Sequence, residues 1–221
     1  MRFRKMFEQA LEMKRREASS FGADITGYSD RWFKQVLSSL GDQDRLHVGF
    51  AGGESPDRFI RFLKKQQNIS SKFNFFIIDE RAVPFESKES NTGQFIRKMN
   101  TPSISLESAM SLYEAGARLE ALDLVILGIG EDGHVASLFP TLSDDDYKHS
   151  GDVVKTPKVG VPEVERYSLS MESLLSARKI ILSVRGGKKL QLLKEFIDTS
   201  DEKIPVVKLM MNHQSISICK V

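Results

Sequence analysis

Five short apolar runs recur along the chain and set the pattern on which the fold prediction depends. They are Leu46 to Phe50, Phe73 to Ile78, Leu122 to Leu127, Lys179 to Val184 and Ser215 to Cys219, with a weaker run at Val153 to Lys155. Short runs rich in branched and aromatic residues are typical of strands covered on both faces. Because amphipathic stretches separate most of them, we predict an α/β fold: a Rossmann-like three-layer αβα arrangement around a mostly parallel sheet of about six strands.

The first 45 residues show helical spacing of apolar positions twice. The spacing is carried by Phe3, Phe7, Ala10 and Leu11, and then by Trp32, Phe33, Val36, Leu37 and Leu40. Ser29 or Asp30 is a suitable N-cap for the second helix, and Gly41 a suitable end. Since no repeat, low-complexity tract or linker divides the chain, we expect one α/β domain over residues 1–221, with the helical segment 1–45 packed on it.

Composition and charge narrow the range of partners. The chain has 221 residues, of which 40% are hydrophobic and 28% charged, and a formal net charge of +2. Basic and acidic residues are interspersed, which argues against nucleic acid as the main partner. No apolar stretch approaches the length of a membrane span, and Met1 to Arg16 mixes acids with bases, unlike a secretory or transit signal. We therefore expect no membrane partner.

Cysteine and histidine usage bears on metals and on redox setting. The single Cys219 cannot form an internal disulfide, which favours a reducing, cytoplasmic setting. The four histidines, His47, His134, His149 and His213, lack the close spacing of metal ligands. We expect no metal site, and either a monomer or a weak homo-oligomer.

Two loops after strand candidates carry residues that suit a shared ligand pocket at one sheet edge. The loop Gly52-Gly53-Glu54-Ser55-Pro56 precedes a helix that Pro56 is suited to begin, and its backbone N–H groups would suit a phosphate. Without a Gly-Lys-Ser/Thr ending it is no Walker loop, and a lone Gly-Gly turn is more often only a connection. Asp79-Glu80-Arg81 brings two acids and a guanidinium to the same sheet edge, although such charges often mark only the return to solvent.

The most informative segment is Gly128 to Pro140, which follows the buried run Leu122 to Leu127. Its glycines allow close backbone approaches in the crevice where open α/β sheets bind ligands. His134 suits proton transfer from water, and Asp132 is placed to orient the ring. The alternative is a histidine used only for local hydrogen bonding, and the glycines at a strand end favour function.

Three further polar segments could bind ions: two that carry cations and the acidic stretch Thr141 to Ser150. Arg166 precedes Tyr167 to Ser170, and Lys189 ends Gly186-Gly187-Lys188-Lys189, which opens a helix after the run Lys179 to Val184. A guanidinium fork and an ammonium suit a phosphate dianion, although each alone is better explained as a surface cation. The polar stretch Thr141 to Ser150 lacks the ligand alternation of a calcium loop, and we expect a surface loop there.

Taken in order, these segments resemble the 6-phosphogluconolactonases, within the wider group that includes glucosamine-6-phosphate isomerase/deaminase. Gly52 to Pro56 resembles the family's Gly-Gly-Ser-Thr-Pro loop, and Asp79 to Pro84 its Asp-Glu-Arg-x-Val-Pro, followed by Ser90-Asn91. Gly128 to Pro140 resembles Gly-x-Gly-x-Asp-Gly-His-x-Ala-Ser-Leu-Phe-Pro, the most specific signature. Arg166 to Ser170 resembles Arg-x-Thr-Leu-Ser, and Gly186 to Lys189 resembles Gly-x-x-Lys.

The resemblance implies hydrolysis of 6-phosphoglucono-1,5-lactone to 6-phosphogluconate, the second step of the oxidative pentose phosphate pathway, with no metal or organic cofactor. By analogy His134 is the general base for the attacking water, and Asp132 orients it. Arg81 steadies the lactone oxygens or the charge that develops on them, and Asp79 contacts the sugar. The phosphate would be held by Gly52, Gly53, Ser55, Arg166 and Lys189.

Departures from the family pattern leave alternatives open. Glu54 stands where serine is usual, and a carboxylate beside a dianion repels it unless the carboxylate points outward or pairs with a cation, so Glu54 is left out of the site. The isomerase/deaminase relatives carry an acid in an Asn-Glu-Pro segment where this chain has Ser137 to Pro140. A non-catalytic sugar-phosphate sensor would keep the fold without needing the His134 and Asp132 pair.

Overall fold

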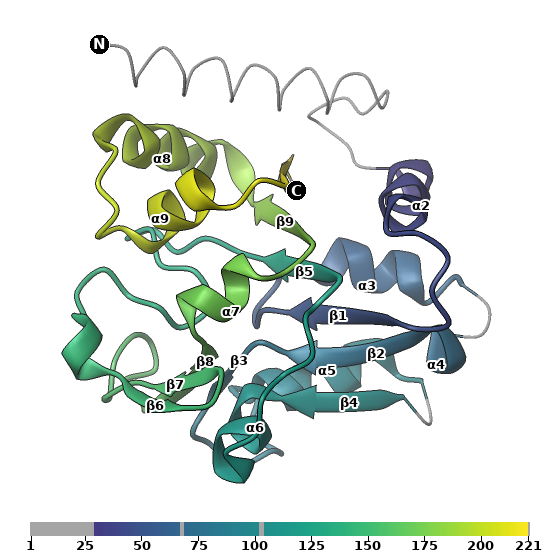
Figure 1. Cartoon of the computed structure of the whole chain (residues 1–221), viewed down its shortest axis with the longest axis horizontal. Helices are drawn as coiled ribbons and strands as arrows, with labels where there is room; N and C mark the ends of the chain where they lie inside the picture. The colour runs from purple at the N-terminus through teal and green to yellow at the C-terminus, as the bar shows by residue number, and fades with distance from the viewer. Residues whose placement is uncertain (1–28, 67–68, 102–103, 221) are drawn as a thin grey trace.

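A six-stranded sheet forms the centre of the molecule (Figure 1). In the computed structural model, which describes residues 29–66, 69–101 and 104–220, neighbouring strands of this sheet are all parallel and follow the order β10-β9-β5-β1-β2-β4. The strands are β1 (Leu46–Phe50), β2 (Phe73–Ile77), β4 (Ser105–Ser108), β5 (Leu124–Leu127), β9 (Lys179–Val184) and β10 (Ile216–Lys220). The predicted parallel sheet is confirmed. Of the six strands of this sheet, only β4, a polar strand at the sheet edge, was absent from the strand candidates.

Helices pack on both faces of this sheet, and the strands alternate between two hydrophobic clusters. Leu124 and Ile126 of β5 join the first cluster, while Val125 and Leu127 join the second. The first contains buried residues of α2 (Asp30–Ser39), α3 (Asp57–Leu63) and α5 (Asn91–Met99). The second contains buried residues of α6 (Ala109–Ala115), α7 (Met171–Leu175), α8 (Gly186–Thr199) and α9 (Pro205–Asn212). A further short helix, α4 (Ile69–Lys72), precedes β2. The three-layer αβα prediction is therefore confirmed.

A second, antiparallel sheet lies beside the first, toward the end of β2 (Figure 1). It consists of β3 (Asp79–Arg81), β8 (Arg166–Leu169), β7 (Val153–Lys155) and β6 (Lys148–Ser150), in that order. The weak strand candidate Val153 to Lys155 is thus a strand, but of this sheet. The expected surface loop Thr141 to Ser150 is wrong in part, because it contains a 3-10 turn, Asp144–Asp146, and β6. The hydrogen bonds between β6 and β7 order its end.

The helix boundaries are close to the predicted ones. Ser29 caps α2, accepting the N–H of Trp32 at 3.3 Å. Phe33 of α2 packs against Phe59 of α3 with 5.0 Å between ring centroids. The prediction that Pro56 begins a helix is off by one residue, because α3 begins at Asp57 and Pro56 is its N-cap. The predicted helix around Phe3 to Leu11 lies outside the described residues.

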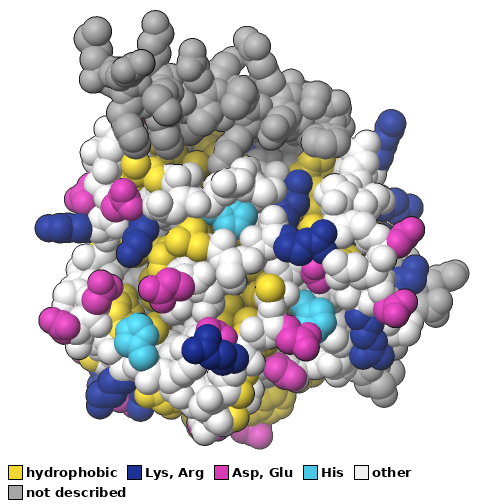
Figure 2. All heavy atoms as spheres, viewed as in Figure 1, with side chains coloured by type: hydrophobic (Ala, Val, Ile, Leu, Met, Phe, Trp, Pro, Cys, Tyr) yellow, Lys and Arg dark blue, Asp and Glu magenta, His cyan; other side chains and the backbone are white. Residues whose placement is uncertain are grey.

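The face of the molecule drawn in Figure 2 carries no single dominant charge. On the face drawn in Figure 2, Lys and Arg side chains are interspersed with Asp and Glu. None of the helices among residues 29–66, 69–101 and 104–220 has both the length and the apolar character needed to cross a membrane.

Candidate active site

One pocket of about 350 Å³ gathers the loops that follow β1, β2, β5 and β9, together with the start of β8. All the predicted site residues except Asp132 line it, namely Gly52, Gly53, Ser55, Asp79, Arg81, His134, Arg166 and Lys189. Parallel strands place the loops after their carboxyl ends at one edge of the sheet, which is why segments so distant in sequence meet here. The lining also includes Glu54, which the prediction left out, and Asn91 and Arg185.

His134 and Asp132 form a closely held pair at one side of this pocket. The imidazole Nδ1 lies 2.6 Å from Asp132 Oδ1, and the backbone N–H of His134 donates to the same oxygen at 3.1 Å. The pair lies across Gly130, where a Cβ atom would overlap both side chains. His134 Nε2 makes no hydrogen bond to any described residue, so this nitrogen remains for a ligand or water.

The electrostatics of Asp132 follow from this contact. Partial burial alone would raise the pKa of the carboxyl group, but the hydrogen bond from the His134 ring and the ring's charge outweigh burial and lower it. Asp132 is therefore an ionised acceptor that holds the ring orientation. The ring of Phe139 lies 4.6 Å from the imidazole centroid and limits its movement on another side.

Asp79, the first residue of β3, joins three other segments beneath the pocket. Its carboxylate accepts hydrogen bonds from the Gly52 N–H at 3.1 Å, the Ser137 hydroxyl at 3.1 Å and the Asn91 side-chain amide at 3.2 Å. Burial raises the pKa of Asp79, and these donors only partly oppose the shift. The amide of Gly52 is thus engaged inside the protein, a contact the sequence did not reveal.

Glu80, the next residue, stabilises the fold by accepting hydrogen bonds at the start of α5. Its carboxylate accepts the N–H groups of Asn91 at 2.8 Å and Thr92 at 2.7 Å and the hydroxyl of Ser90 at 3.3 Å, which places it at the start of α5. These contacts satisfy backbone donors that a helix leaves unpaired at its N-terminus. Glu80 is not among the residues that line the pocket.

Arg81 and Arg166 lie directly opposite each other in the β3–β8 register. Arg81 Nη1 donates to the Glu89 carbonyl at 2.7 Å, whereas its buried Nε finds no partner among the described residues. Arg166 is 5% exposed and donates to the Val159 and Pro162 carbonyls, both at 3.0 Å. Like charges opposite each other on neighbouring strands are destabilising, so this side of the pocket favours an anion.

Burial also affects the charge of Arg166. It lowers the pKa of the guanidinium, and the nearby charge of Arg81 acts in the same direction, while Asp79 opposes both. Arginine remains protonated in proteins even so. The result is a fixed, poorly solvated cation beside a second one.

Ser55 and Lys189 both lie against the glycine segment. A Cβ atom at Gly128 would overlap the Ser55 hydroxyl, so glycine is needed for the two loops to come together. Lys189, in the first turn of α8, donates from Nζ to the Ile129 carbonyl at 2.8 Å. Both side chains therefore reach the pocket where the loops after β1 and β5 meet.

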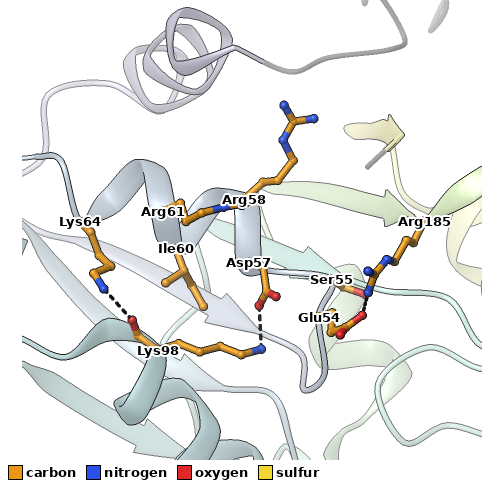
Figure 3. Close-up of a pocket in the computed structure, with 9 residues that line it drawn as sticks. All are labelled: Glu54, Ser55, Asp57, Arg58, Ile60, Arg61, Lys64, Lys98 and Arg185. Atoms are coloured by element: carbon orange, nitrogen blue, oxygen red, sulfur yellow. Dashed lines mark hydrogen bonds and ion pairs between the residues drawn. The ribbon is translucent and has the colours of Figure 1, made fainter.

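Glu54 forms an ion pair with Arg185, the residue after β9 (Figure 3). The pairing removes the conflict that a carboxylate in a phosphate loop would otherwise create. Sequence reasoning stated this condition but did not identify Arg185, because a single cation after a strand carries no distinctive pattern. The only available signal was the unusual glutamate itself.

No group of three or more His, Cys, Asp or Glu side chains in the described part of the chain has an arrangement suited to a metal ion.

Comparison with known proteins gives consistent similarities. The family model for glucosamine-6-phosphate isomerases/6-phosphogluconolactonase matches residues 25–218. The 6-phosphogluconolactonase of Thermotoga maritima is 30% identical over 192 residues, which cover 77% of this chain and 85% of the relative. That of Borreliella burgdorferi is 28% identical over 216 residues, covering 86% and 89%.

Solved structures show the same fold. The crystal structure of the Thermotoga maritima 6-phosphogluconolactonase superposes with a TM-score of 0.69 at 23% identity and covers 87% of this chain and 92% of that one. A 6-phosphogluconolactonase from Shewanella baltica gives 0.71 at 18% identity, covering 96% and 94%.

Proposed function

The chain belongs to the family of glucosamine-6-phosphate isomerases and 6-phosphogluconolactonases, and on this premise we propose that it is an enzyme that hydrolyses 6-phosphoglucono-1,5-lactone to 6-phosphogluconate. This is the second step of the oxidative pentose phosphate pathway. The observation that carries the proposal is the meeting of a His–Asp pair with anion-binding side chains in one pocket. A single cytoplasmic domain, monomeric or weakly associated, is part of the same proposal.

The phosphate would bind at the side of the pocket formed by Ser55, Arg166 and Lys189, with the backbone of Gly53. The two opposed arginines, Arg81 and Arg166, support this assignment because a dianion between or beside them would relieve their repulsion. Gly52 contributes through its shape, since a side chain there would overlap Asn91 and its amide already donates to Asp79.

The reaction would take place at His134. Its Nε2 removes a proton from water as the water oxygen attacks the lactone carbonyl carbon, and Asp132 balances the positive charge that the ring gains. Collapse of the tetrahedral intermediate breaks the bond to the ring oxygen, which leaves as the hydroxyl after taking up the proton. A lactone is already reactive, so one base, a positioned water and binding through a remote phosphate suffice.

Arg81 and Asp79 have supporting roles in this proposal. Arg81 keeps a buried Nε–H that has no partner in the part of the chain that the structure describes, and such a donor suits the oxygen that becomes negative in the tetrahedral intermediate. Asp79 acts as a positioning residue, because its carboxylate ties the Gly52 loop, Ser137 and Asn91 together.

The segment Ser137 to Pro140 distinguishes the lactonase from the isomerase/deaminase. Where those relatives carry an acid, this chain places a buried serine bonded to Asp79 and a phenylalanine against the His134 ring. Ring opening and proton shuttling at carbon require a further acid in this position, and hydrolysis does not. The contacts therefore favour the lactonase.

The decisive experiment is hydrolysis of freshly generated lactone by the purified protein, followed by coupling to the next oxidation or by proton release. We expect acceleration over spontaneous hydrolysis, and His134→Ala should lower kcat by about 100-fold or more, the range of general base catalysis, while still binding 6-phosphogluconate. His149→Ala, an exposed histidine outside the pocket, is the matched control. No acceleration by the wild type would refute the proposal.

A further inference from the structure

A second hollow, of about 600 Å³, lies against α3, and His134 is not among the residues that line it (Figure 3). We call it the α3 pocket. Its cationic side chains come from three parts of the chain: Arg58, Arg61 and Lys64 from α3 and its C-cap, Lys98 from α5, and Arg185 from the end of β9. None of the residues assigned above to acid–base chemistry lines it.

The two carboxylates of the α3 pocket are already engaged. Asp57 accepts a hydrogen bond from Lys98 Nζ at 2.6 Å, and Glu54 pairs with Arg185 (Figure 3). Within each pair the negative charge of the carboxylate cancels the positive charge of its partner. The remaining charge of the pocket is therefore that of three cations.

The three remaining cations, Arg58, Arg61 and Lys64, are spaced three residues apart and so follow one face of α3. Lys64 Nζ donates to the Lys98 backbone carbonyl at 3.1 Å, and the guanidinium groups of Arg58 and Arg61 make no hydrogen bond or ion pair with any described residue. Like charges at this spacing on a helix destabilise it. A cationic row that has no acidic partner among residues 29–66, 69–101 and 104–220, beside a hollow, indicates a polyanionic ligand.

We propose that the α3 pocket binds a small polyphosphate, the class that includes nucleoside di- and triphosphates. Guanidinium forks match phosphate oxygens in a bidentate manner, and the ammonium adds a point charge. Each step of three residues rises about 4.5 Å along a helix, so the row extends over about 9 Å, further than a single phosphate reaches. A chain of linked phosphates contacts all three cations at once.

The α3 pocket shares Glu54, Ser55 and Arg185 with the active-site pocket. A polyphosphate that draws Arg185 toward itself leaves Glu54 uncompensated beside the proposed sugar-phosphate site. The two ligands should therefore weaken each other's binding, and by the same factor in both directions. This coupling rests on the proposed function, whereas binding in the α3 pocket does not.

The direct test is calorimetric titration of the full-length protein with sodium tripolyphosphate at constant ionic strength, without any sugar phosphate. We expect one saturable site, and R58A/R61A should raise the Kd by about tenfold or more, since two charge-assisted contacts are lost. The matched control, K148A/K194A, removes the same charge from exposed positions outside both pockets and should leave the Kd within about twofold. A nucleoside triphosphate should behave as tripolyphosphate does.

Four results would overturn the assignment. Unchanged affinity in R58A/R61A, or loss of binding in Lys189→Ala instead, would place the anion in the active-site pocket. An equal loss of affinity in K148A/K194A would show that the effect depends only on the net charge of the protein. Inorganic phosphate binding as tightly as tripolyphosphate would exclude a polyphosphate site. Retained affinity of R58A/R61A for 6-phosphogluconate shows that the variant is folded. An unchanged Kd for tripolyphosphate in saturating 6-phosphogluconate would refute the coupling.

Discussion

Asp132 accepts two hydrogen bonds from a single residue, one from the imidazole and one from the backbone N–H of His134. The ring cannot rotate without losing the first, and the chain cannot move without losing the second. His134 is therefore oriented before any ligand binds, which is the condition for an efficient general base. Gly130 is a requirement of the same arrangement, because a larger residue would overlap the pair.

Asp132→Asn tests this arrangement through its pH dependence. The pKa of Asp132 is lowered on folding, so the unfolded chain binds its proton at higher pH than the folded one does. The carboxylate's stabilising contribution is fully present above the ordinary value of 3.8 and is lost as pH falls through the lowered folded value. We expect Asp132→Asn to have a lower urea midpoint than the wild type near neutral pH and a smaller difference from the wild type near pH 3.

The control for this measurement is Glu131→Gln, which changes a neighbouring carboxylate that pairs with Lys188 at 3.4 Å near the surface. Its effect on the urea midpoint should be small near neutral pH. A wild-type advantage over Asp132→Asn that is equally large at both pH values would show that the carboxylate charge is not what the folded state stabilises.

The Glu54–Arg185 pair predicts a compensating double substitution. Arg185→Ala leaves the Glu54 charge beside the proposed phosphate position, and we expect KM for the phosphorylated lactone to rise about tenfold with little change in kcat. Adding Glu54→Ser removes the repelling charge, so the double variant should recover most of the lost affinity. Steady-state kinetics of the two single variants and the double variant measure this coupling.

Unphosphorylated gluconolactone provides the comparison substrate for that cycle. Since the repulsion is between Glu54 and the phosphate, Arg185→Ala should change its KM little. A similar rise for both substrates, or no recovery on adding Glu54→Ser, would show that Arg185 acts by some route other than neutralising Glu54.

At the scale of the element, β3 assigns a different task to each of its three residues. Asp79 ties neighbouring loops together, Glu80 lies at the start of α5, and Arg81 lines the pocket. Alternation of side chains along a strand makes this division possible, because successive residues point to opposite faces. The strand also carries the chain from the parallel to the antiparallel sheet.

Glu80→Ala should therefore destabilise the protein although Glu80 is outside the pocket. It leaves buried donors at the start of α5 without an acceptor, and we expect a loss of about 2–4 kcal/mol in the free energy of unfolding. Urea denaturation measures the loss. Glu86→Ala, at an exposed position on the same connection, should change the free energy by less than about 0.5 kcal/mol. Equal effects of the two substitutions would contradict the capping role.

The strands that sequence did not predict share a physical reason. They are Asp79–Arg81, Ser105–Ser108, Lys148–Ser150 and Arg166–Leu169. Each is three or four residues long and at least half polar, so neither length nor hydrophobic pattern distinguishes it from a loop. Their pairing depends on neighbours distant in sequence. The long apolar strands were predicted because burial on two faces fixes their composition locally.

The same distinction holds within the site. Glycine, histidine and cation motifs at strand ends were sufficient to predict residues that the structure brings into one pocket. Contacts across the pocket were not predictable, since the Gly52 amide is engaged by Asp79 and Glu54 is paired by Arg185. Such contacts depend on how loops from distant parts of the chain come together in the fold, and the local spacing of residues does not encode that arrangement.

On the scale of the whole molecule, the parallel sheet links the pocket to a distant thiol. Cys219 of the edge strand β10 is 2% exposed and belongs to the cluster that also contains Phe50 of β1. Burial raises the pKa of this thiol to about 12, although the charge of Arg58 opposes the shift. At about pH 8 the folded protein should therefore present almost no thiolate, and reaction with a disulfide reagent requires opening of the structure.

The rate of Cys219 labelling thus reports which opening occurs. If the molecule opens as one cooperative unit, 6-phosphogluconate at about 100 times its Kd should slow labelling about 100-fold, because a ligand that binds only the folded state stabilises it by mass action. If β10 separates from β9 alone, the distant ligand leaves the rate unchanged. We expect the first result, since residues of β10 contribute to both hydrophobic clusters, Ile216 to one and Cys219 to the other. Labelling in urea, where the thiol is freely accessible, gives the reference rate, and a ligand-independent rate in buffer would show that β10 opens separately from the sheet that supports the pocket.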